Sequence, residues 1–149
     1  SGMSEYSTIE AEIEKHGTGI FTNVGDSMMP LLRQRRDIIH ISKVEGRLKK
    51  YDVPLYKRDN GQYVLHRILK VRENDYVICG DNRTGMEEGI TDRHIIGVMT
   101  GVSRDGKFLS VNDKKYKLYV MLWGGRKSYR IFLLRVKSVM KRLIKGKGR

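Results

Sequence analysis

A serine stands between a glycine and a proline in residues 25–32, whose sequence is GDSMMPLL. Gly25 allows the backbone to enter a turn without a Cβ clash, and Pro30 fixes φ three residues after Ser27. A turn of this kind can present the Ser27 hydroxyl and its backbone N–H toward the same side. A nucleophile needs this presentation, because its own N–H can then stabilise the oxyanion of an acyl-transfer reaction. A loop punctuated by glycine and proline, with an incidental serine, is the other interpretation of these residues.

A serine hydroxyl needs a general base within hydrogen-bond reach, and the chain offers four histidines, His16, His40, His66 and His94. His66 lies in the apolar stretch 62–71, 39 residues after Ser27. Alternation along a strand places His66 on one face with Val64 and Ile68. A lone histidine on an apolar face can equally be a satisfied core residue. By residue type alone, His66 is therefore both a candidate base and a candidate core side chain.

Four segments in a fixed order resemble the motifs of the signal peptidase/LexA-type serine peptidases, and the match covers about residues 20–100. His66 precedes Arg67 at the place where bacterial type I signal peptidases have lysine before arginine. This departure resembles the histidine-type signal peptidases of the endoplasmic reticulum and the archaea. Tyr51 is a second departure, since the family usually has glycine there. The segments are Gly25-Asp26-Ser27-Met28-Met29-Pro30, Asp52-Val53-Pro54-Leu55-Tyr56, Val64-Leu65-His66-Arg67-Ile68, and Gly80-Asp81-Asn82-Arg83 followed by Thr91-Asp92-Arg93.

The resemblance implies a serine endopeptidase that cleaves peptide or leader-peptide bonds and uses no cofactor or metal. Ser27 is the expected nucleophile and His66 the expected general base. The histidine branch has an aspartate in its closing motif, and Asp92 is the expected partner that orients the imidazole. Asp81 is the alternative partner, although we expect it to make structural hydrogen bonds in a turn. Another interpretation of Asp92 is an ion pair with Arg93 or a cap at the end of a helix or strand.

The family binds its substrate as an extended strand added to a sheet edge, and the predicted hairpin around Asn60-Gly61 is the candidate edge. Met28 and Met29 are expected either to shape an apolar groove for small substrate side chains or to be core residues. A histidine base titrates near neutral pH and needs little burial, whereas a lysine base must be desolvated. We therefore expect His66→Lys to lose most of the activity.

The pattern of short apolar runs and turn residues predicts a mainly β domain, a coiled barrel or sandwich of hairpins as in LexA and the signal peptidases. Residues 7–16 are predicted to form a short N-terminal helix, with Ser7 and Glu10 as a capping box. Residues 84–91 are predicted to form a loop. The predicted strands are 19–22, 37–41, 53–58, 62–71, 75–79, 94–102, 107–111 and 115–122.

The positive charge of the chain is concentrated near its C-terminal end. The net charge is +13, yet residues 1–113 hold 17 basic and 17 acidic side chains, whereas residues 114–149 hold 13 basic and no acidic ones. From residue 125 to residue 144 the spacing predicts an amphipathic helix, with Arg130, Lys137 and Lys141 away from the apolar face. Such a helix predicts anionic partners. The apolar face consists of Phe132, Val136, Val139, Met140 and Leu143.

Three partners suit this helix. Its apolar face can pack on the β domain, it can lie on an anionic membrane surface, or it can bind nucleic acid or an acidic peptide. Nucleic acid is the least favoured of these. The longest apolar runs of the sequence are shorter than a spanning helix requires. We therefore expect a cytoplasmic protein, with peripheral membrane association through the helix as the further option.

The sequence predicts two parts, separated at Gly124-Gly125. Residues 1–123 form a β-rich serine peptidase-like domain, and residues 124–149 form the basic amphipathic helix and tail. The single cysteine, Cys79, excludes an internal disulfide and is expected in the core. The alternative function is a non-catalytic binding module on the same fold. In that case the tail engages an anionic membrane or nucleic acid, and Ser27 and His66 are vestigial.

Overall fold

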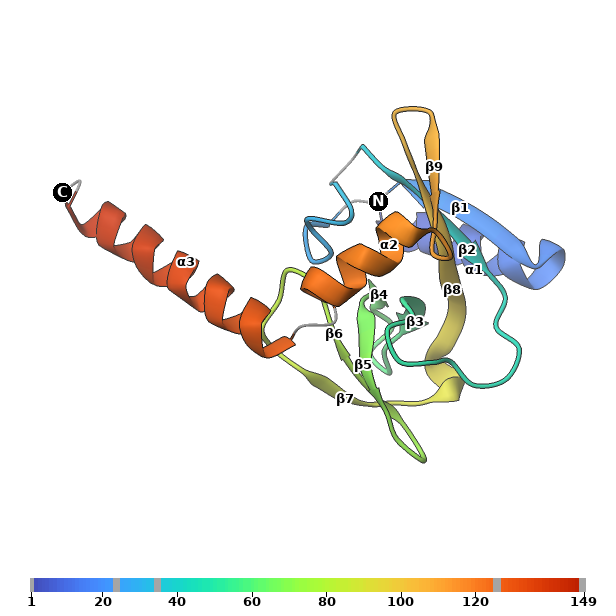
Figure 1. Ribbon diagram of the computed structural model, residues 1–149. Coiled ribbons are helices and arrows are strands. Elements are labelled where there is room, and N and C mark those ends of the chain that lie inside the picture. The colour runs from blue at the N-terminus through green and yellow to red at the C-terminus, as the bar shows by residue number, and fades with distance from the viewer. Residues whose placement is uncertain (1, 23–24, 34–35, 125–126, 148–149) are drawn as a thin grey trace.

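The computed structural model describes the chain except for residues 1, 23–24, 34–35, 125–126 and 148–149. The fold is mainly β, with a curled antiparallel sheet, a short N-terminal helix and a C-terminal helix (Figure 1), as predicted. The elements are α1 (Gly2–His16), β1 (Thr18–Thr22), β2 (Ile38–Ser42), β3 (Pro54–Lys57), β4 (Tyr63–Leu65), β5 (Arg67–Val71), β6 (Tyr76–Cys79), β7 (Glu87–Ile90), the 3₁₀ helix η1 (Asp92–His94), β8 (Ile95–Arg104), β9 (Lys107–Ser110), α2 (Lys114–Tyr119), the π-helical turn η2 (Val120–Gly124) and α3 (Lys127–Lys147).

The strands form two antiparallel sheets. The larger sheet has the order β1-β2-β8-β3-β4, and β9 pairs with β8. The long strand β8 therefore holds this sheet together, because it pairs with β2, β3 and β9. The register shifts twice along β8, between His40 and Ile41 and between Leu55 and Tyr56 of its partners, and such irregularities increase the local twist. The smaller sheet has the order β5-β6-β7.

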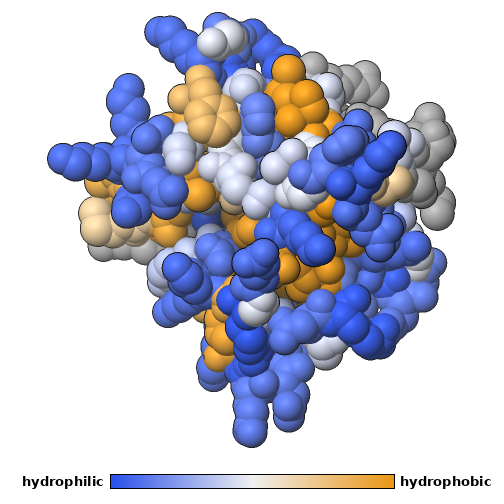
Figure 2. All heavy atoms as spheres, turned by 90° about the vertical axis from the view of Figure 1, so that its right-hand side faces the viewer, coloured by the Kyte–Doolittle hydropathy of each residue, from blue (hydrophilic) through white to orange (hydrophobic). Residues whose placement is uncertain are grey.

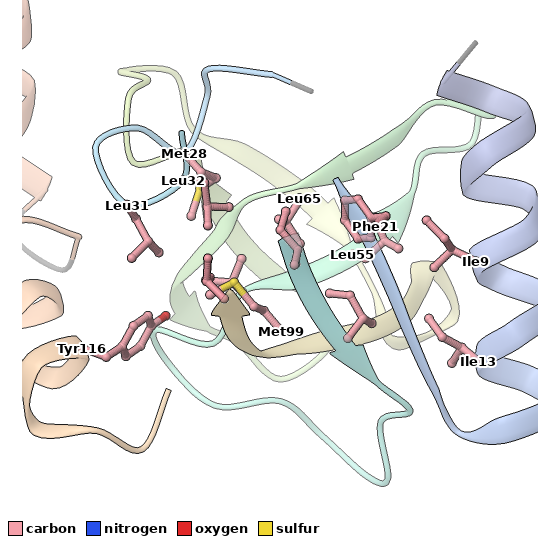
Figure 3. Packing of buried hydrophobic residues seen from close by; sticks show 14 of the residues in the cluster. Ile9, Ile13, Phe21, Met28, Leu31, Leu32, Leu55, Leu65, Met99 and Tyr116 are labelled. Carbon is pink, nitrogen blue, oxygen red and sulfur yellow. The ribbon is translucent and has the colours of Figure 1, made fainter. Parts of the chain in front are cut away.

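The main core lies inside the larger sheet, where it is closed by α1 on one side and by residues 28–32 on another (Figure 3). Ile9 and Ile13 of α1 point toward Phe21 and Leu55 of the sheet. Their spacing of four residues places both on one helix face, which explains the burial of this face. A second cluster under the smaller sheet contains Tyr56, Ile68, Tyr76, Ile78 and Ile90. Cys79 of β6 is buried, as predicted.

Four predicted elements differ from the structure. The helix α1 already begins at Gly2, so Ser7 lies inside it and is not its N-cap. The predicted strand 62–71 is divided at His66 into β4 and β5, which belong to different sheets. Residues 87–90 form β7, an edge strand of the smaller sheet, instead of part of a loop. Residues 115–122 are helical, because Tyr116 and Val120, the two buried side chains, have helical and not strand spacing.

The C-terminal helix α3 extends away from the rest of the molecule (Figure 1). Its predicted apolar face does not pack on the β domain, and all five members are exposed: Phe132 63%, Val136 43%, Val139 44%, Met140 53% and Leu143 57%. The predicted boundary at Gly124-Gly125 falls partly outside the described residues. Among the described helices, none is both long enough and apolar enough to cross a lipid bilayer.

Candidate active site

Ser27 belongs to the Ser27 turn, residues 26–32, which is anchored in the main core. Met28, Leu31 and Leu32 are buried, and Figure 3 shows all three side chains directed into the cluster. Ser27 itself is half-buried. Burial of the apolar side chains on one side of the turn thus fixes a backbone that leaves the serine on the other side accessible.

The Ser27 turn is fastened to the closing loop, residues 80–83, which follows β6. The Asn82 N–H donates to the Ser27 carbonyl oxygen at 2.7 Å, and the Asn82 side-chain amide donates to the Asp26 carbonyl oxygen at 3.1 Å. The Arg83 guanidinium donates to the Asp26 carboxylate at 2.6 Å. Two segments more than 50 residues apart in the chain are therefore tied together on both sides of the serine.

Gly80 makes this close approach sterically feasible. A Cβ atom at Gly80 would lie 2.6 Å from the Ser27 carbonyl oxygen and 3.1 Å from Cδ2 of His66. The serine turn and the histidine ring therefore meet at the one place where the closing loop has no side chain. The described residues do not support the steric role predicted for Gly25, because a Cβ there would meet none of them within 4 Å and its φ is not positive. The glycine that the geometry requires is Gly80.

Ser27 and His66 line one pocket of about 780 Å³. Both side chains are half-buried. Within the described part of the chain, neither side chain has a hydrogen-bond partner, and the Ser27 backbone N–H has none either. Two residues that could act together on a ligand thus line this pocket, although the hydroxyl and the imidazole are not hydrogen-bonded to each other.

His66 is the single residue between β4 and β5, at the point where the chain passes from the larger sheet to the smaller one. Its ring lies edge-on to Tyr56, with 6.5 Å between ring centroids. The predicted shared face with Ile68 is wrong, because Ile68 is buried in the second cluster while His66 lines the pocket. The change of sheet breaks the strand alternation at this residue, and His66 lines the pocket instead of the second cluster.

The surroundings of His66 favour its neutral form. Burial, reinforced by the positive charge of Arg58, lowers the pKa of His66 to about 4, while Glu87 acts in the opposite direction. At neutral pH the imidazole is therefore uncharged and able to accept a proton. From the sequence, we expect a histidine base that needs little burial and titrates near neutral pH. In the structure, burial is the largest cause of the lowered pKa of His66.

Glu87 of β7 is an acidic residue of the pocket that the sequence did not point to. Its carboxylate accepts a hydrogen bond from the Tyr56 hydroxyl at 2.6 Å and two from Arg58, at 2.8 and 2.9 Å. Burial would raise the pKa of Glu87, but the hydrogen bonds from Arg58 and Tyr56 outweigh it and the pKa is lowered. No local pattern ties Glu87 to His66, because they come together only through the pairing of β6 with β5 and β7.

The structure does not bring Asp92 to His66. Asp92 begins η1, where its carboxylate accepts a hydrogen bond from the Tyr76 hydroxyl and pairs with Arg47 at 3.5 Å. Its side chain is 56% exposed and does not line the pocket. The carboxylates whose charges act on His66 are instead those of Glu87 and Asp81. The predicted role of Asp92 in orienting the imidazole is therefore corrected.

Asp81 forms a buried ion pair with Arg67, which gives it a structural role in the fold. Its carboxylate accepts hydrogen bonds from Nε and Nη2 of Arg67, at 2.8 and 2.9 Å, and one from the Tyr119 hydroxyl at 2.6 Å. Both charged side chains are fully buried. Burial disfavours the charged form of Arg67, but the charge of Asp81 outweighs this, so the pKa of Arg67 is raised. Tyr116 of α2 also accepts a hydrogen bond from Arg67 at 3.0 Å.

The two methionines beside Ser27 do not shape the pocket. Met28 is a core residue, and its sulfur accepts a hydrogen bond from the Asp81 N–H at 3.3 Å. Met29 is 39% exposed and lies outside the pocket lining. Met86, from the loop before β7, is the methionine that lines the pocket. The apolar groove predicted for Met28 and Met29 is therefore wrong, and the core alternative holds for Met28.

A serine and a histidine are directly hydrogen-bonded elsewhere in the fold. Nε2 of His40 lies 2.8 Å from the Ser103 hydroxyl, across the pairing of β2 and β8. The Phe108 ring lies edge-on to His40, with 4.9 Å between ring centroids. Neither His40 nor Ser103 lines the pocket of Ser27. This second pair provides an internal control for tests of the first.

Comparison of the chain with models of protein families, with characterised proteins and with solved structures finds no match. The function proposed below is therefore inferred from the residues and geometry of the site.

Proposed function

We propose that this chain is a serine endopeptidase that cleaves peptide or leader-peptide bonds, with Ser27 as the nucleophile and His66 as the general base. The observation that carries the proposal is the convergence at Gly80. Ser27 and His66 come from segments 39 residues apart, both approach Gly80 closely, and both line one pocket. The resemblance of the segments around Ser27 and His66 to the motifs of the histidine-type signal peptidases supports the same assignment.

In the proposed reaction the Ser27 oxygen attacks the carbonyl carbon of a peptide bond while His66 accepts the hydroxyl proton. The Ser27 backbone N–H, which has no partner among the described residues, donates to the developing oxyanion. As the tetrahedral intermediate collapses, the C–N bond breaks and His66 delivers its proton to the leaving amine. A water molecule then attacks the acyl carbon while His66 accepts its proton, and His66 returns this proton to the Ser27 oxygen as the acyl C–O bond breaks and the acid product leaves. The hydroxyl must rotate toward the imidazole when substrate binds, as catalytic hydrogen bonds often tighten only in the complex.

The substrate is expected to bind as an extended strand along β4, the last strand in the order of the larger sheet. Among the described strands β4 pairs only with β3 and ends the strand order of its sheet. Tyr63, Val64 and Leu65 all line the pocket, and the strand leads directly into His66. A peptide added to this edge would carry its scissile bond toward the imidazole.

Incubation with a peptide library, read by mass spectrometry, tests the proposal. Ser27→Ala and His66→Ala should each lose activity about a thousandfold or more, and the double variant should lose little beyond either single variant, because the two side chains act as a unit. Ser103→Ala is the matched control, since its hydroxyl is already hydrogen-bonded to a histidine, and its rate should be unchanged. Equal cleavage by the wild type and Ser27→Ala would refute the assignment.

A non-catalytic peptide-binding module is the second candidate. It is favoured by the absence, among the described residues, of a carboxylate hydrogen-bonded to His66. In this case the wild type would bind extended peptides without cleaving any, and Ser27→Ala would bind them equally well. Fluorescence anisotropy with labelled library peptides, measured beside the cleavage assay, separates the two functions.

A further inference from the structure

The helix α3 exposes a continuous apolar stripe. The stripe runs along most of the helix at spacings of three and four residues, which places its members on one face. Figure 2 shows the molecule from the right-hand side of Figure 1, where projecting hydrophilic side chains interrupt and partly cover the hydrophobic residues. The α3 stripe consists of Tyr129, Phe132, Val136, Val139, Met140, Leu143 and Ile144, each at least 43% exposed.

The opposite face of α3 is basic. Arg135, Lys137, Lys141, Arg142 and Lys145 are all exposed, and no acidic residue follows Asp113 in the sequence. A helix of low overall hydrophobicity, with an apolar stripe on one side and lysines and arginines on the other, has the character of a helix that lies in the interface of a bilayer. The apolar side chains enter the acyl boundary, and the cations remain among the headgroups.

We propose that α3 binds the surface of an anionic lipid bilayer. The α3 stripe inserts into the bilayer, and the basic face contacts the anionic headgroups. A nucleic acid would satisfy the charge but would leave the stripe in water. A second copy of the chain would cover the stripe, but it would bring together two helices that carry only positive charge. An anionic bilayer offers acyl chains to the apolar stripe and negative headgroups to the basic face. Of the three partners, it is the one that contacts both faces favourably.

The root of α3 lies beside the candidate active site. Trp123, in the turn that leads to the helix, donates its indole N–H to the Asp81 carbonyl oxygen at 3.1 Å. Asp81 adjoins Gly80, against which Ser27 and His66 are held. Binding of α3 to lipid would therefore hold the pocket close to the membrane surface. The lipid interaction itself requires none of the serine chemistry.

Sedimentation with vesicles tests the proposal. The full chain should pellet with vesicles of phosphatidylcholine and phosphatidylglycerol, and only weakly with vesicles of phosphatidylcholine alone. Raising the salt concentration from about 0.05 M to about 0.5 M should weaken binding by screening. The triple variant Lys137→Gln/Lys141→Gln/Lys145→Gln should bind about a hundredfold more weakly, at about fivefold per lysine. The triple variant Phe132→Ser/Val136→Ser/Leu143→Ser should lose at least about tenfold.

Matched controls distinguish binding through α3 from nonspecific adsorption of the protein to vesicles. Ile20→Ser removes an apolar side chain of β1 that is 57% exposed, and Lys70→Gln/Lys107→Gln removes two exposed cations of the β domain. Both should pellet like the wild type, as should Ser27→Ala, whose result separates lipid binding from the proposed catalysis. Circular dichroism should show the same helix content in every α3 variant.

Three results would overturn the proposal. The first is no pelleting with anionic vesicles at low salt. The second is pelleting that is insensitive to the Phe132→Ser/Val136→Ser/Leu143→Ser variant, together with equally tight binding of a labelled DNA duplex, which would show a general polyanion-binding helix. The third is a dimer in sedimentation equilibrium that this same variant dissociates, which would show that a second copy covers the stripe.

Discussion

Arg67 and Asp81 form a two-point ion pair, with 2.8 Å between Nε and Oδ1 and 2.9 Å between Nη2 and Oδ2, and both side chains are fully buried. Arg67 directly follows His66, and Asp81 directly follows Gly80. The pair therefore joins the segment that carries the proposed base to the loop that fastens the serine turn. Its geometry makes it a positioning element for the site, although neither side chain lines the pocket.

Asp81→Asn should destabilise the protein by about 3–5 kcal/mol, because it leaves the buried Arg67 guanidinium without an opposite charge. Urea unfolding of the two proteins measures this loss. Glu88→Gln is the matched control. Glu88 pairs with Arg72 at 3.2 Å, but its side chain is 64% exposed, so its replacement should change stability by less than about 1 kcal/mol. Similar losses in both variants would contradict the structural role of the buried pair.

Gly80→Ala should both destabilise the fold and displace Ser27, because the added Cβ would lie 2.6 Å from the Ser27 carbonyl oxygen. We expect a loss of about 1–3 kcal/mol in the free energy of unfolding, and about a hundredfold in kcat/KM from misplacement of the proposed nucleophile. Gly25→Ala serves as the comparison, since its Cβ would meet none of the described residues within 4 Å, and its stability should change by no more than about 0.5 kcal/mol. If the two alanine variants behave alike, the close approach at Gly80 does not matter.

His66 should titrate with a pKa near 4 in the folded protein, against about 6.5 for an unperturbed histidine. NMR titration of its ring protons, assigned with His66→Gln, measures this value. Because the neutral ring is the proposed base, kcat/KM should stay level as the pH falls from 7 to about 5 and then decline through about 4. The unfolded state binds the proton first, so stability should fall between about pH 6.5 and 4, by up to about 1.4 kcal/mol per pH unit. An apparent pKa near 6.5 would contradict the burial argument.

His66→Lys should retain part of the activity at alkaline pH. The surroundings that lower the pKa of His66, namely burial and the positive charges of Arg58 and Arg83, would also lower the pKa of a lysine at this position. The sequence alone predicts a loss of most of the activity, and the burial of His66 changes this expectation. The pH profile of kcat/KM for the lysine variant should lie above that of Ser27→Ala and rise with pH. Activity no higher than that of Ser27→Ala at every pH would show that a lysine does not replace the imidazole.

The C-terminal segment should have two unequal contributions to stability. Ending the chain after residue 124 removes only α3, whose described apolar stripe is exposed, and should change the free energy of unfolding by no more than about 0.5 kcal/mol. Ending it after residue 113 also removes the buried Tyr116 and Val120, and the hydroxyls of Tyr116 and Tyr119 that bond the Arg67–Asp81 pair. This second truncation should cost at least about 3 kcal/mol. Equal stability of the two truncated chains would contradict a role of α2 in the fold.

The elements predicted correctly are those whose apolar spacing matches one period over their whole length. β2, β8 and the amphipathic α3 belong to this group. The segment 115–122 was predicted as a strand because its turn residues suggest another hairpin, and only the burial of Tyr116 and Val120 reveals its helical period. The division at His66 has no local sequence mark, since it follows from the way the two sheets meet.

The sequence identifies the candidate site residues that stand in short motifs. It does not predict the contacts that form between segments distant in the chain. Ser27 and His66 stand out by residue type and motif. The partners of Asp92 and Asp81 are Tyr76 and Arg67, and these contacts arise from the packing of β5, β6 and the C-terminal helices. A carboxylate in the right motif can therefore be bound elsewhere, and only the tertiary structure distinguishes a site acid from a structural one.

Trp123 is the only tryptophan in the chain, and its half-buried indole bonds to the carbonyl of Asp81 at the root of α3. Its fluorescence emission therefore reports on two events without any attached dye. A shift in emission wavelength would register loosening of the closing loop, and quenching by brominated lipids would register the depth at which the C-terminal helix meets a bilayer.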